Sequence, residues 1–505
     1  MDCDLESIQE ARDLLGLAKE AAEAFASVDQ GKVDAIVRGM GEAAENAAAS
    51  LARLAVDETG MGRAEDKVIK NVFSAVTVRD YILPLRTAGI IREIPEMRVK
   101  ELAVPMGVVA ALIPTTNPTS TVIYKALIAV KARNAIVFSP HPRATNCSLE
   151  TVRIMMRAAE EAGAPPNLLS CMSQPTVDAT KELMSHANTA VILATGGSAM
   201  VRSAYSSGKP AYGVGPGNVP AIVERTADVP TAVADIIAGK TFDNGVLCSA
   251  ENSLICDAPV EEEVRRELAL QRALFVRGDD REKLEQLMRD PRTGGVNTAI
   301  VGLPATEIAH RAGISVADDT RALLVECNEV GPQEFFSREK LSPVLAFYVE
   351  NGWERCCDRS IELLQYGGIG HSLVIHSNDE RVINRFFEEK PAFRILVNTV
   401  AAVGAVGHTT GLAPAMTLGP GTWGGSSTSD NITPLHLVNV KRLAWGIRPY
   451  VAVDAPAGTA GTAGTAGTAG KMGPNKEDGA ADWDVEEIER VVVEFMAERG
   501  AGRAL

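Results

Sequence analysis

A repeated alternation of strand-like and helix-like segments between residues 104 and 207 constrains the fold of this chain more than any other feature. Four apolar runs have the length and composition of buried strands, and each is followed by a segment with helical periodicity. The strand-like runs are 107–113, 135–139, 167–171 and 190–194, and the helical segments are 119–131, 145–162, 175–185 and 198–207. Parallel strands need crossover helices of this length, so the pattern predicts a doubly wound α/β layer.

The rest of the chain divides around this layer. Residues 1–90 are rich in Ala, Glu and Leu with helical periodicity, and a second α/β region spans about 221–430. We therefore expect two doubly wound α/β domains, 1–220 with the N-terminal helices and 221–435. A strand at 436–453 is expected to follow them as a sheet edge or an oligomer contact. At 505 residues the chain is long enough to bury two cores.

The C-terminal tail differs in kind from the body. Residues 454–482 contain the repeat GTAGTAGTAGTAG, which has too few apolar side chains to fold and predicts a flexible linker. Residues 483–499 then place Val485, Ile488 and Phe495, among others, on one helical face with acids on the other. This tethered amphipathic helix either folds back on the body or a dimer partner, or docks on another protein. We favour docking.

Composition argues against several classes of function. The formal net charge of −15 repels nucleic-acid phosphates, and no Lys/Arg-rich block overrides it. The longest apolar runs fall well short of a membrane span, and the acidic, helical N-terminus does not resemble a secretory signal. Eight scattered cysteines without a CxxC pair fit a reducing cytosol, so we expect a cytoplasmic protein. No metal site is expected.

One cysteine lies in surroundings that suit a nucleophile. Cys248 follows the turn-forming residues Asp243, Asn244 and Gly245, and small residues follow it. A thiol at such a loop-to-helix junction is expected to be partly exposed and close to helix N-terminal amides, which favour the thiolate. A lone loop cysteine is more often inert than catalytic, so this assignment depends on partners elsewhere in the chain.

Three loops offer such partners. The loop 114–118 contains Asn117, which is either a turn residue or an amide donor to a developing oxyanion. The loop 195–198 ends a predicted strand and opens a helix, an arrangement that presents backbone amides to a phosphate. The loop 213–218 has three glycines. No G-x-G-x-x-G fingerprint follows the first strand, so an ordinary dinucleotide-binding Rossmann domain is not predicted.

Several motifs together carry a resemblance to one family. They are VPMGVVAALIPTTNPT (104–119), SPHPRA (139–144), TGGSAMVRSAYSSGKPAYGVGPGN (195–218), FDNGVLCSAEN (242–252), EKLSPVLA (339–346), GGIGH (367–371), RILVNT (394–399) and LAPAMTLGPGTWGGSS (412–427). On these motifs, which occur in family order, the chain resembles the aldehyde dehydrogenase superfamily and specifically its CoA-acylating branch. That branch includes microcompartment propionaldehyde dehydrogenases and the aldehyde half of bifunctional alcohol/aldehyde dehydrogenases. No iron-dependent alcohol dehydrogenase segment follows, so we expect a monofunctional enzyme.

The resemblance implies a thioester mechanism. Cys248 is expected to attack a short-chain aldehyde, with the oxyanion held by the Asn117 side-chain amide and the Cys248 backbone amide. Hydride transfer to NAD would leave a thioester on Cys248, which coenzyme A would release as acyl-CoA. Glu339 is expected to hold the nicotinamide ribose, and a surface acid is its alternative reading. The positions that match the family's nucleotide cleft are Leu112, Ile113, Pro114, Thr115, Thr116, Asn117, Gly197, Gly215, Glu339 and Leu418.

Two departures from the wider superfamily refine the expected reaction. Hydrolytic members carry a water-activating Glu in the region matching 213–217, whereas this chain reads GVGPGN, which favours acyl transfer to CoA. The segment 139–143 lacks the Lys and Glu that many members use around the adenosine ribose, so NADP remains an alternative to NAD. His371 either assists proton transfer or is a satisfied core histidine.

The resemblance also implies substrates and partners. We expect propionaldehyde or acetaldehyde, with a functionalised aldehyde such as sulfoacetaldehyde as an alternative. The tail resembles encapsulation peptides, which implies packing inside a bacterial microcompartment through docking of 483–499 on a shell protein. A homo-oligomer, either dimer or tetramer, is expected. The remaining alternatives are a CoA-independent hydrolytic dehydrogenase and a structural microcompartment cargo with a degenerate site.

Overall fold

The computed structural model describes residues 3–448 and 450, and Met1–Trp445 form one compact unit. The predicted linker 454–482 and docking helix 483–499 lie outside the described residues. The N-terminal region is helical, as predicted. Its helices are α1 (Cys3–Phe25), α2 (Gln30–Asn46), α3 (Ala48–Thr59), α4 (Ala64–Val72) and α5 (Val78–Ile82).

A five-stranded parallel sheet confirms the predicted doubly wound layer. Its strand order is β5-β4-β3-β6-β7, so the connections reverse direction across the sheet at β3. The strands are β3 (Val108–Ile113), β4 (Ala135–Pro140), β5 (Leu169–Cys171), β6 (Thr189–Thr195) and β7 (Ala211–Val214). The helices are α6 (Pro118–Lys131), α7 (Thr145–Glu161), α8 (Val177–Ser185) and α9 (Ser198–Tyr205). Because crossovers are right-handed, this reversal puts α6 and α7 on one face and α8 and α9 on the other.

A second, seven-stranded sheet is also parallel throughout, with the order β10-β11-β12-β9-β8-β13-β14. Its strands are β8 (Val219–Val223), β9 (Glu251–Asp257), β10 (Ala273–Phe275), β11 (Ala322–Glu326), β12 (Val344–Glu350), β13 (Leu373–His376) and β14 (Ile395–Val397). The helices of this region are α10 (Val229–Thr241), α11 (Glu261–Leu270), α12 (Asp279–Met288), α13 (Ala305–Arg311), α14 (Trp353–Tyr366), α15 (Glu380–Glu389) and α16 (Ala401–Gly404). The two sheets confirm the α/β fold class.

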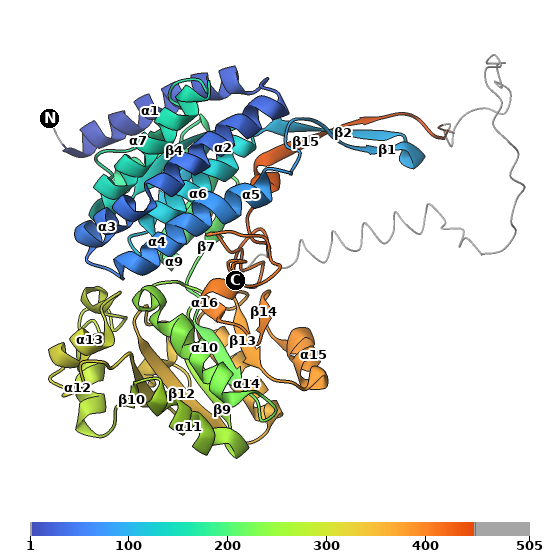
Figure 1. Ribbon diagram of the computed structural model, residues 1–505. Coiled ribbons are helices and arrows are strands. Elements are labelled where there is room, and N and C mark those ends of the chain that lie inside the picture. The colour runs from blue at the N-terminus through green and yellow to red at the C-terminus, as the bar shows by residue number, and fades with distance from the viewer. Residues whose placement is uncertain (1–2, 449, 451–505) are drawn as a thin grey trace, which may run out of the picture. The chain divides into compact units, whose positions relative to one another are not determined.

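A three-stranded antiparallel sheet extends from the helical body (Figure 1). It consists of β1 (Gly89–Ile94), β2 (Val99–Pro105) and β15 (Val438–Ala444), with β2 in the centre. The strand predicted at 436–453 is confirmed over β15. The hairpin of β1 and β2 was not predicted, because Pro95 and Met97 interrupt a short segment of mixed polarity.

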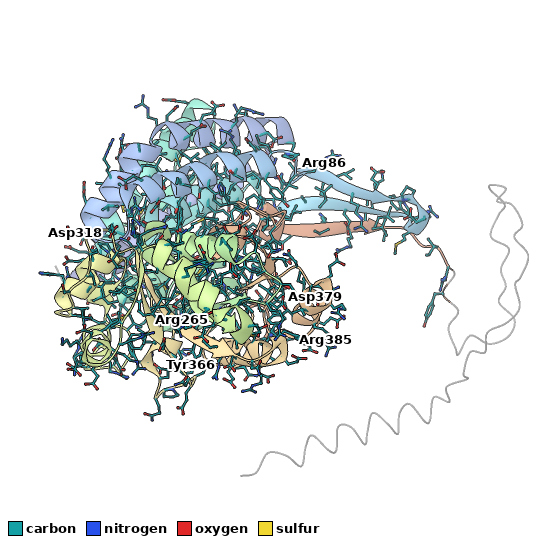
Figure 2. The ribbon with its side chains drawn as sticks, turned by 60° about the horizontal axis from the view of Figure 1, so that its bottom comes forward. Arg86, Arg265, Asp318, Tyr366, Asp379 and Arg385 are labelled. Carbon is teal, nitrogen blue, oxygen red and sulfur yellow. The ribbon has the colours of Figure 1, made fainter. Side chains whose placement is uncertain are left out.

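The outer helices present charged faces. Figure 2 labels Asp379 and Arg385 at α15, and Arg265, which is partly buried, on α11. Arg265 bonds Glu261 at 2.7 Å and Glu326 at 2.6 Å. In the part of the chain that the structure describes, no helix combines the length and apolarity needed to cross a bilayer.

Candidate active site

Cys248 lies in the connection between α10 and β9, beside a cavity of about 320 Å³. The connection opens with a single turn, Phe242–Gly245, in which Asp243, Asn244 and Gly245 all have positive φ. Cys248 keeps some exposed surface, as expected. The expectation of a following helix is wrong, because the chain enters the buried strand β9 at Glu251.

The resting thiol of Cys248 is protonated. Burial raises its pKa to about 12, the Glu339 charge adds to the rise, and the Arg394 charge and two backbone N–H groups oppose it. No helix N-terminus offsets these effects, so the expectation of a favoured thiolate is wrong for the free chain. A reaction at Cys248 therefore requires a change in its surroundings when ligands bind, or a proton acceptor.

The cavity beside Cys248 is formed where parallel strands end. The loops after β3, β6 and β7 all reach it from the carboxyl edge of the first sheet, the usual ligand position in doubly wound folds. Its lining residues are Ile113, Pro114, Thr115, Thr116, Asn117, His141, Thr195, Gly196, Gly197, Ser198, Met200, Val214, Gly215, Pro216, Val246, Cys248, Glu339 and Leu341. A side chain at Gly197 or Gly215 would meet no atom within 4 Å, so both glycines leave room for a ligand.

Most of the predicted site residues therefore meet at one cavity, although three, Leu112, Leu418 and His371, do not line it. Leu112 is buried in β3, where its carbonyl accepts a hydrogen bond from Lys125 at 2.8 Å. Leu418 is 1% exposed and pairs with Asn431 in an isolated β-bridge. His141, Met200 and Val246 also line the cavity but were not predicted. The motifs of their segments had drawn attention to other residues.

Asn117 is the residue that precedes α6, and its side chain has defined partners. Its Oδ1 accepts a hydrogen bond from Lys70 Nζ at 2.5 Å, and its Nδ2 donates to Thr116 Oγ1 at 3.1 Å. Because an amide nitrogen has two N–H groups, one stays available for a ligand oxygen. Asn117 and Cys248 line the same cavity.

Glu339 is a cavity residue and not a surface acid. Its carboxylate accepts the Gly217 N–H at 2.7 Å, and burial raises its pKa. A Cβ on Gly217 would lie 1.7 Å from the Cys248 carbonyl oxygen, so this glycine lets the loop after β7 pack directly on the thiol loop. Gly217 therefore makes two contacts, a hydrogen bond to the Glu339 carboxylate and close packing against the backbone of Cys248.

His371 is fully buried and does not line the cavity. Its Nδ1 contacts Ser372 Oγ at 3.1 Å, while Nε2 has no hydrogen-bond partner among the described residues. Burial lowers the pKa of His371 to about 3, with the Arg394 charge adding to the effect, so the ring is neutral. Its Cε1 lies 3.4 Å from where a Cβ on Gly217 would be. His371 therefore packs behind the loop that touches Cys248.

Arg394 was not predicted as a site residue. It is 3% exposed and bonds only neutral oxygens among the described residues, including the His371 carbonyl at 3.0 Å and Asn431 Oδ1 at 2.7 Å. Burial lowers the pKa of Arg394 to about 10. The motif RILVNT was recognised in the sequence. Nothing in the motif indicated that the charge of its arginine would act on the Cys248 thiol.

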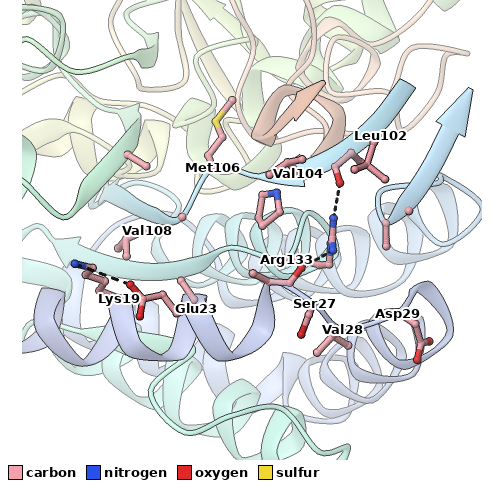
Figure 3. A pocket seen from close by; sticks show the side chains of 18 of the residues that line it. Lys19, Glu23, Ser27, Val28, Asp29, Leu102, Val104, Met106, Val108 and Arg133 are labelled. Carbon is pink, nitrogen blue, oxygen red and sulfur yellow. Dashed lines mark hydrogen bonds and ion pairs between the residues drawn. The ribbon is translucent and has the colours of Figure 1, made fainter. Parts of the chain in front are cut away.

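A larger cavity of about 960 Å³ lies elsewhere, between α1 and β2 (Figure 3). Arg133 crosses it to donate to the Ala26 and Ala103 carbonyls, at 2.5 and 2.7 Å. No thiol is among its lining residues. Within residues 3–448, no group of three His, Cys, Asp or Glu side chains is arranged to hold a metal ion.

A partly buried thiol, an amide side chain and glycine-rich strand ends meet around one cavity of a doubly wound α/β fold. The aldehyde dehydrogenase family model matches residues 2–287. The chain belongs to the aldehyde dehydrogenase family, which confirms the resemblance seen in the sequence.

Curated relatives place the chain in one branch of that family. The bifunctional aldehyde-alcohol dehydrogenase AdhE of Escherichia coli is 41% identical over 443 residues, which cover 87% of this chain and 50% of the relative. The chain thus spans about half the length of the aldehyde-alcohol dehydrogenases that it matches. The succinate-semialdehyde dehydrogenase (acetylating) of Clostridium kluyveri is 36% identical, over 86% of this chain and 95% of its own length.

Solved structures agree with this placement. An acetylating aldehyde dehydrogenase from Geobacillus thermoglucosidasius has a TM-score of 0.88 at 49% identity, covering 90% of this chain and all of that one. A propionaldehyde dehydrogenase from the fucose utilisation microcompartment of Clostridium phytofermentans has a TM-score of 0.77 at 26% identity, covering 86% and 97%. A Rhodopseudomonas palustris propionaldehyde dehydrogenase, solved with bound CoA and an acylated cysteine, has a TM-score of 0.76 at 26% identity, covering 86% and 97%.

Proposed function

We propose that this chain is a CoA-acylating aldehyde dehydrogenase that oxidises a short-chain aldehyde to its acyl-CoA with NAD. The observation that carries the proposal is the meeting of Cys248 and Asn117 at one cavity. Glu339 is the only carboxylate among the described lining residues, and it is bonded to the Gly217 N–H. No carboxylate stands in the loop 213–218, where hydrolytic members keep the one that activates water, so a thiol is the better acyl acceptor.

The residues have separate roles in this reaction. Cys248 releases its proton to solvent and attacks the aldehyde carbon, and the resulting oxyanion accepts hydrogen bonds from the Asn117 amide and the Cys248 N–H. The cavity residues, including Gly197, Gly215 and Glu339, would hold NAD, which would supply a hydride acceptor for that carbon, so that Cys248 would carry a thioester. The CoA thiolate then attacks the thioester, releasing acyl-CoA and restoring the thiol. The Rhodopseudomonas relative with bound CoA and an acylated cysteine supports these two covalent steps.

The test compares product formation with and without CoA. Purified chain, propionaldehyde and NAD should form NADH and propionyl-CoA only when CoA is present, and free propionate would instead support the hydrolytic alternative. Cys248→Ala should abolish turnover. Cys171→Ala is the matched control, because Cys171 is also partly exposed but does not line the cavity. Full activity in Cys248→Ala would exclude the mechanism, and an inactive wild-type chain would favour the structural-cargo alternative.

NAD is the proposed hydride acceptor, with NADP as its alternative. Arg143 belongs to the segment 139–143, which the family resemblance places at the adenosine ribose, and its guanidinium donates to the Thr59 carbonyl at 2.9 Å. Because that group is already engaged, it is less suited to bind a 2′-phosphate. Assays with NAD and NADP at equal concentration should give a higher kcat/KM with NAD.

The cavity supports a small uncharged aldehyde. Among its described lining residues there is no Lys or Arg to bind a sulfonate or carboxylate. Acetaldehyde and propionaldehyde should therefore be preferred over sulfoacetaldehyde and succinate semialdehyde, although relatives named for both charged substrates match the chain. A kinetic panel of these four aldehydes with CoA tests the preference.

We also propose that the chain forms a homo-oligomer and is packed inside a bacterial microcompartment. The support for packing is the amphipathic pattern of 483–499 after the linker 454–482, and the microcompartment relative. Truncation after Asp454 should leave turnover unchanged and release the enzyme from a co-expressed shell fraction. Unchanged co-purification with the shell would exclude docking through this helix.

A further inference from the structure

Two lysines of α4 join the loop that contains Asn117 to the loop that contains Cys248. Lys67 Nζ donates to the Thr116 carbonyl and to the Asp243 carboxylate, each at 2.9 Å. Lys70 Nζ donates to the same carboxylate and to Asn117 Oδ1, the latter at 2.5 Å. Both lysines and Asp243 are buried, with 4% exposure or less. Water therefore competes little with these bonds.

Asp243 is fixed in the turn that precedes Cys248. Its Oδ1 accepts the Arg63 N–H at 2.6 Å, and its own N–H donates to Asp66 Oδ2 at 2.9 Å. Its φ of 49° lies in the left-handed region, which is strained for a residue with a side chain. The bonds to α4 hold this conformation, so α4 determines where the thiol loop begins.

We propose that Lys70 is a positioning residue that fixes the orientation of the Asn117 amide for the oxyanion. Burial lowers the pKa of Lys70 to about 7, with the Asp243 charge opposing the shift. In its charged form the ammonium group only donates, so the amide turns Oδ1 toward Lys70 and its Nδ2 away from it. One Nδ2–H bonds Thr116 Oγ1, and the other remains for the substrate oxygen. Without Lys70, the amide is free to rotate and present a carbonyl oxygen to a developing negative charge. This inference rests on the proposed function of Asn117 as oxyanion donor.

Lys67 provides the matched comparison. It bonds the same carboxylate and lies on the same helix, but its second partner is a backbone carbonyl and not the Asn117 amide. A general loss of packing or charge at α4 should affect both lysine variants alike. An effect that acts through the amide should appear only for Lys70.

A double-mutant cycle on the full chain tests the proposal, with propionaldehyde, NAD and CoA as substrates. Loss of one oxyanion donor lowers kcat by about 10²–10³-fold, so Asn117→Ala should fall in that range. Lys70→Met should lower kcat by about 10²-fold with little change in the KM for NAD, and should add no further loss in the Asn117→Ala background. Lys67→Met should lower kcat by the same factor in both backgrounds. Independent, multiplicative effects of Lys70→Met and Asn117→Ala, or a wild-type kcat in Lys70→Met, would overturn the proposal.

A structural readout tests the role of Lys70 independently of activity. If the wild-type chain forms no acyl-CoA, that result refutes the proposed function alone, and the structural readout still decides whether Lys70 orients the Asn117 amide. Crystal structures of the wild-type chain and Lys70→Met should show the Asn117 amide displaced or rotated in the variant, with the fold retained. An amide in the same orientation in both crystals would overturn the positioning role.

Discussion

The charge of Glu339 is the largest influence on the Cys248 thiol after burial itself. Glu339 lines the cavity and is bonded to the Gly217 N–H, so it is held close to the thiol loop. Its negative charge disfavours the thiolate, and Arg394 acts in the opposite sense. Burial and the Glu339 charge therefore raise the pKa of Cys248, which lowers the reactivity of its thiol toward oxidation and alkylation.

Replacing Glu339 with Gln should make Cys248 more reactive while weakening cofactor binding. Removing the negative charge lowers the thiol pKa, and each unit of decrease gives about tenfold more thiolate at a pH below that pKa. The iodoacetamide alkylation rate of Cys248 between pH 7 and 9 should rise, and the KM for NAD should rise with it. Cys248→Ala identifies the labelled site, and an alkylation profile like that of wild type would contradict the assigned charge effect.

Part of the candidate site could be predicted from local motifs. Cys248, Asn117 and Glu339 meet at the cavity, and their motifs pointed to them. Lys70 was missed, and Asp243 was noted only as a turn former, because the two residues are 173 positions apart and become partners only in the fold. The expected thiolate at Cys248 was wrong for a related reason. Burial raises the pKa of this thiol, and burial depends on tertiary packing that a local sequence pattern does not show.

Three loops stack backbone against backbone behind the thiol. A Cβ on Gly217 would lie 1.7 Å from the Cys248 carbonyl oxygen, and one on Gly368 would lie 1.9 Å from the Gly217 carbonyl oxygen. Such contacts exclude any side chain, so glycine at these two positions determines the position of the Cys248 loop.

Gly217→Ala should displace this loop and lower kcat/KM by about 100-fold or more, because misplacing a reacting atom by about 1 Å has that effect. Gly411→Ala is the control, since a Cβ there meets no atom within 4 Å. Steady-state kinetics measures the loss, and circular dichroism checks that the fold persists. Wild-type kinetics in Gly217→Ala would show that the stack is not needed.

A second histidine makes the stability of the β13 region sensitive to acid. His376 is 2% exposed at the end of β13, and burial lowers its pKa from 6.5 to about 4. The unfolded chain therefore binds a proton below pH 6.5 that the folded chain does not accept, so stability is lost as the pH falls from 6.5 toward 4.

His376 should make the free energy of unfolding fall with decreasing pH by about 1.4 kcal/mol per pH unit between pH 6 and pH 4.5. His376→Gln should flatten the dependence of the unfolding free energy on pH by that amount, measured by urea denaturation at several pH values. His310→Gln, which replaces an exposed histidine on α13, is the control. An unchanged slope in His376→Gln would contradict the assignment.

At the scale of elements, apolar runs with crossover-length spacing predicted β3 to β6 and their helices closely. Every residue of β3 and α6 is buried. The apolar pattern that predicted these two elements is therefore the same pattern that forms the core. The hairpin of β1 and β2 was missed because its side chains are mostly exposed or half-buried and leave no hydrophobic period. Its strands are defined by pairing with each other and with β15.

The molecule as a whole exposes an apolar surface on this three-stranded sheet. Leu443 and Trp445 are 55% and 42% exposed, and Leu102 on the neighbouring strand is 37% exposed. Large apolar side chains grouped on an extended sheet suit contact with a second copy.

Leu443→Glu should weaken the proposed homo-oligomer, because a buried unpaired carboxylate at the interface is costly. Sedimentation-velocity analysis over a range of concentrations should show a smaller species than wild type. Leu270→Glu, at an exposed leucine on α11, is the matched control. A Leu443→Glu variant with the wild-type sedimentation profile would place the contact elsewhere.

The antiparallel pairing of β15 with β2 also has a consequence for the order in which the chain folds. Arg442 bonds Glu101 across 341 positions, and Asn134 and Tyr124 bond backbone carbonyls at Leu437 and Ile432. During synthesis the ribosome releases β2 and residues 108–214 long before β15 emerges, so the edge of β2 that β15 later pairs with waits unpaired. Such late, long-range closure is intrinsically slow. Nascent chains stalled before residue 438 should therefore depend on chaperones, and chains stalled well beyond residue 445 should not.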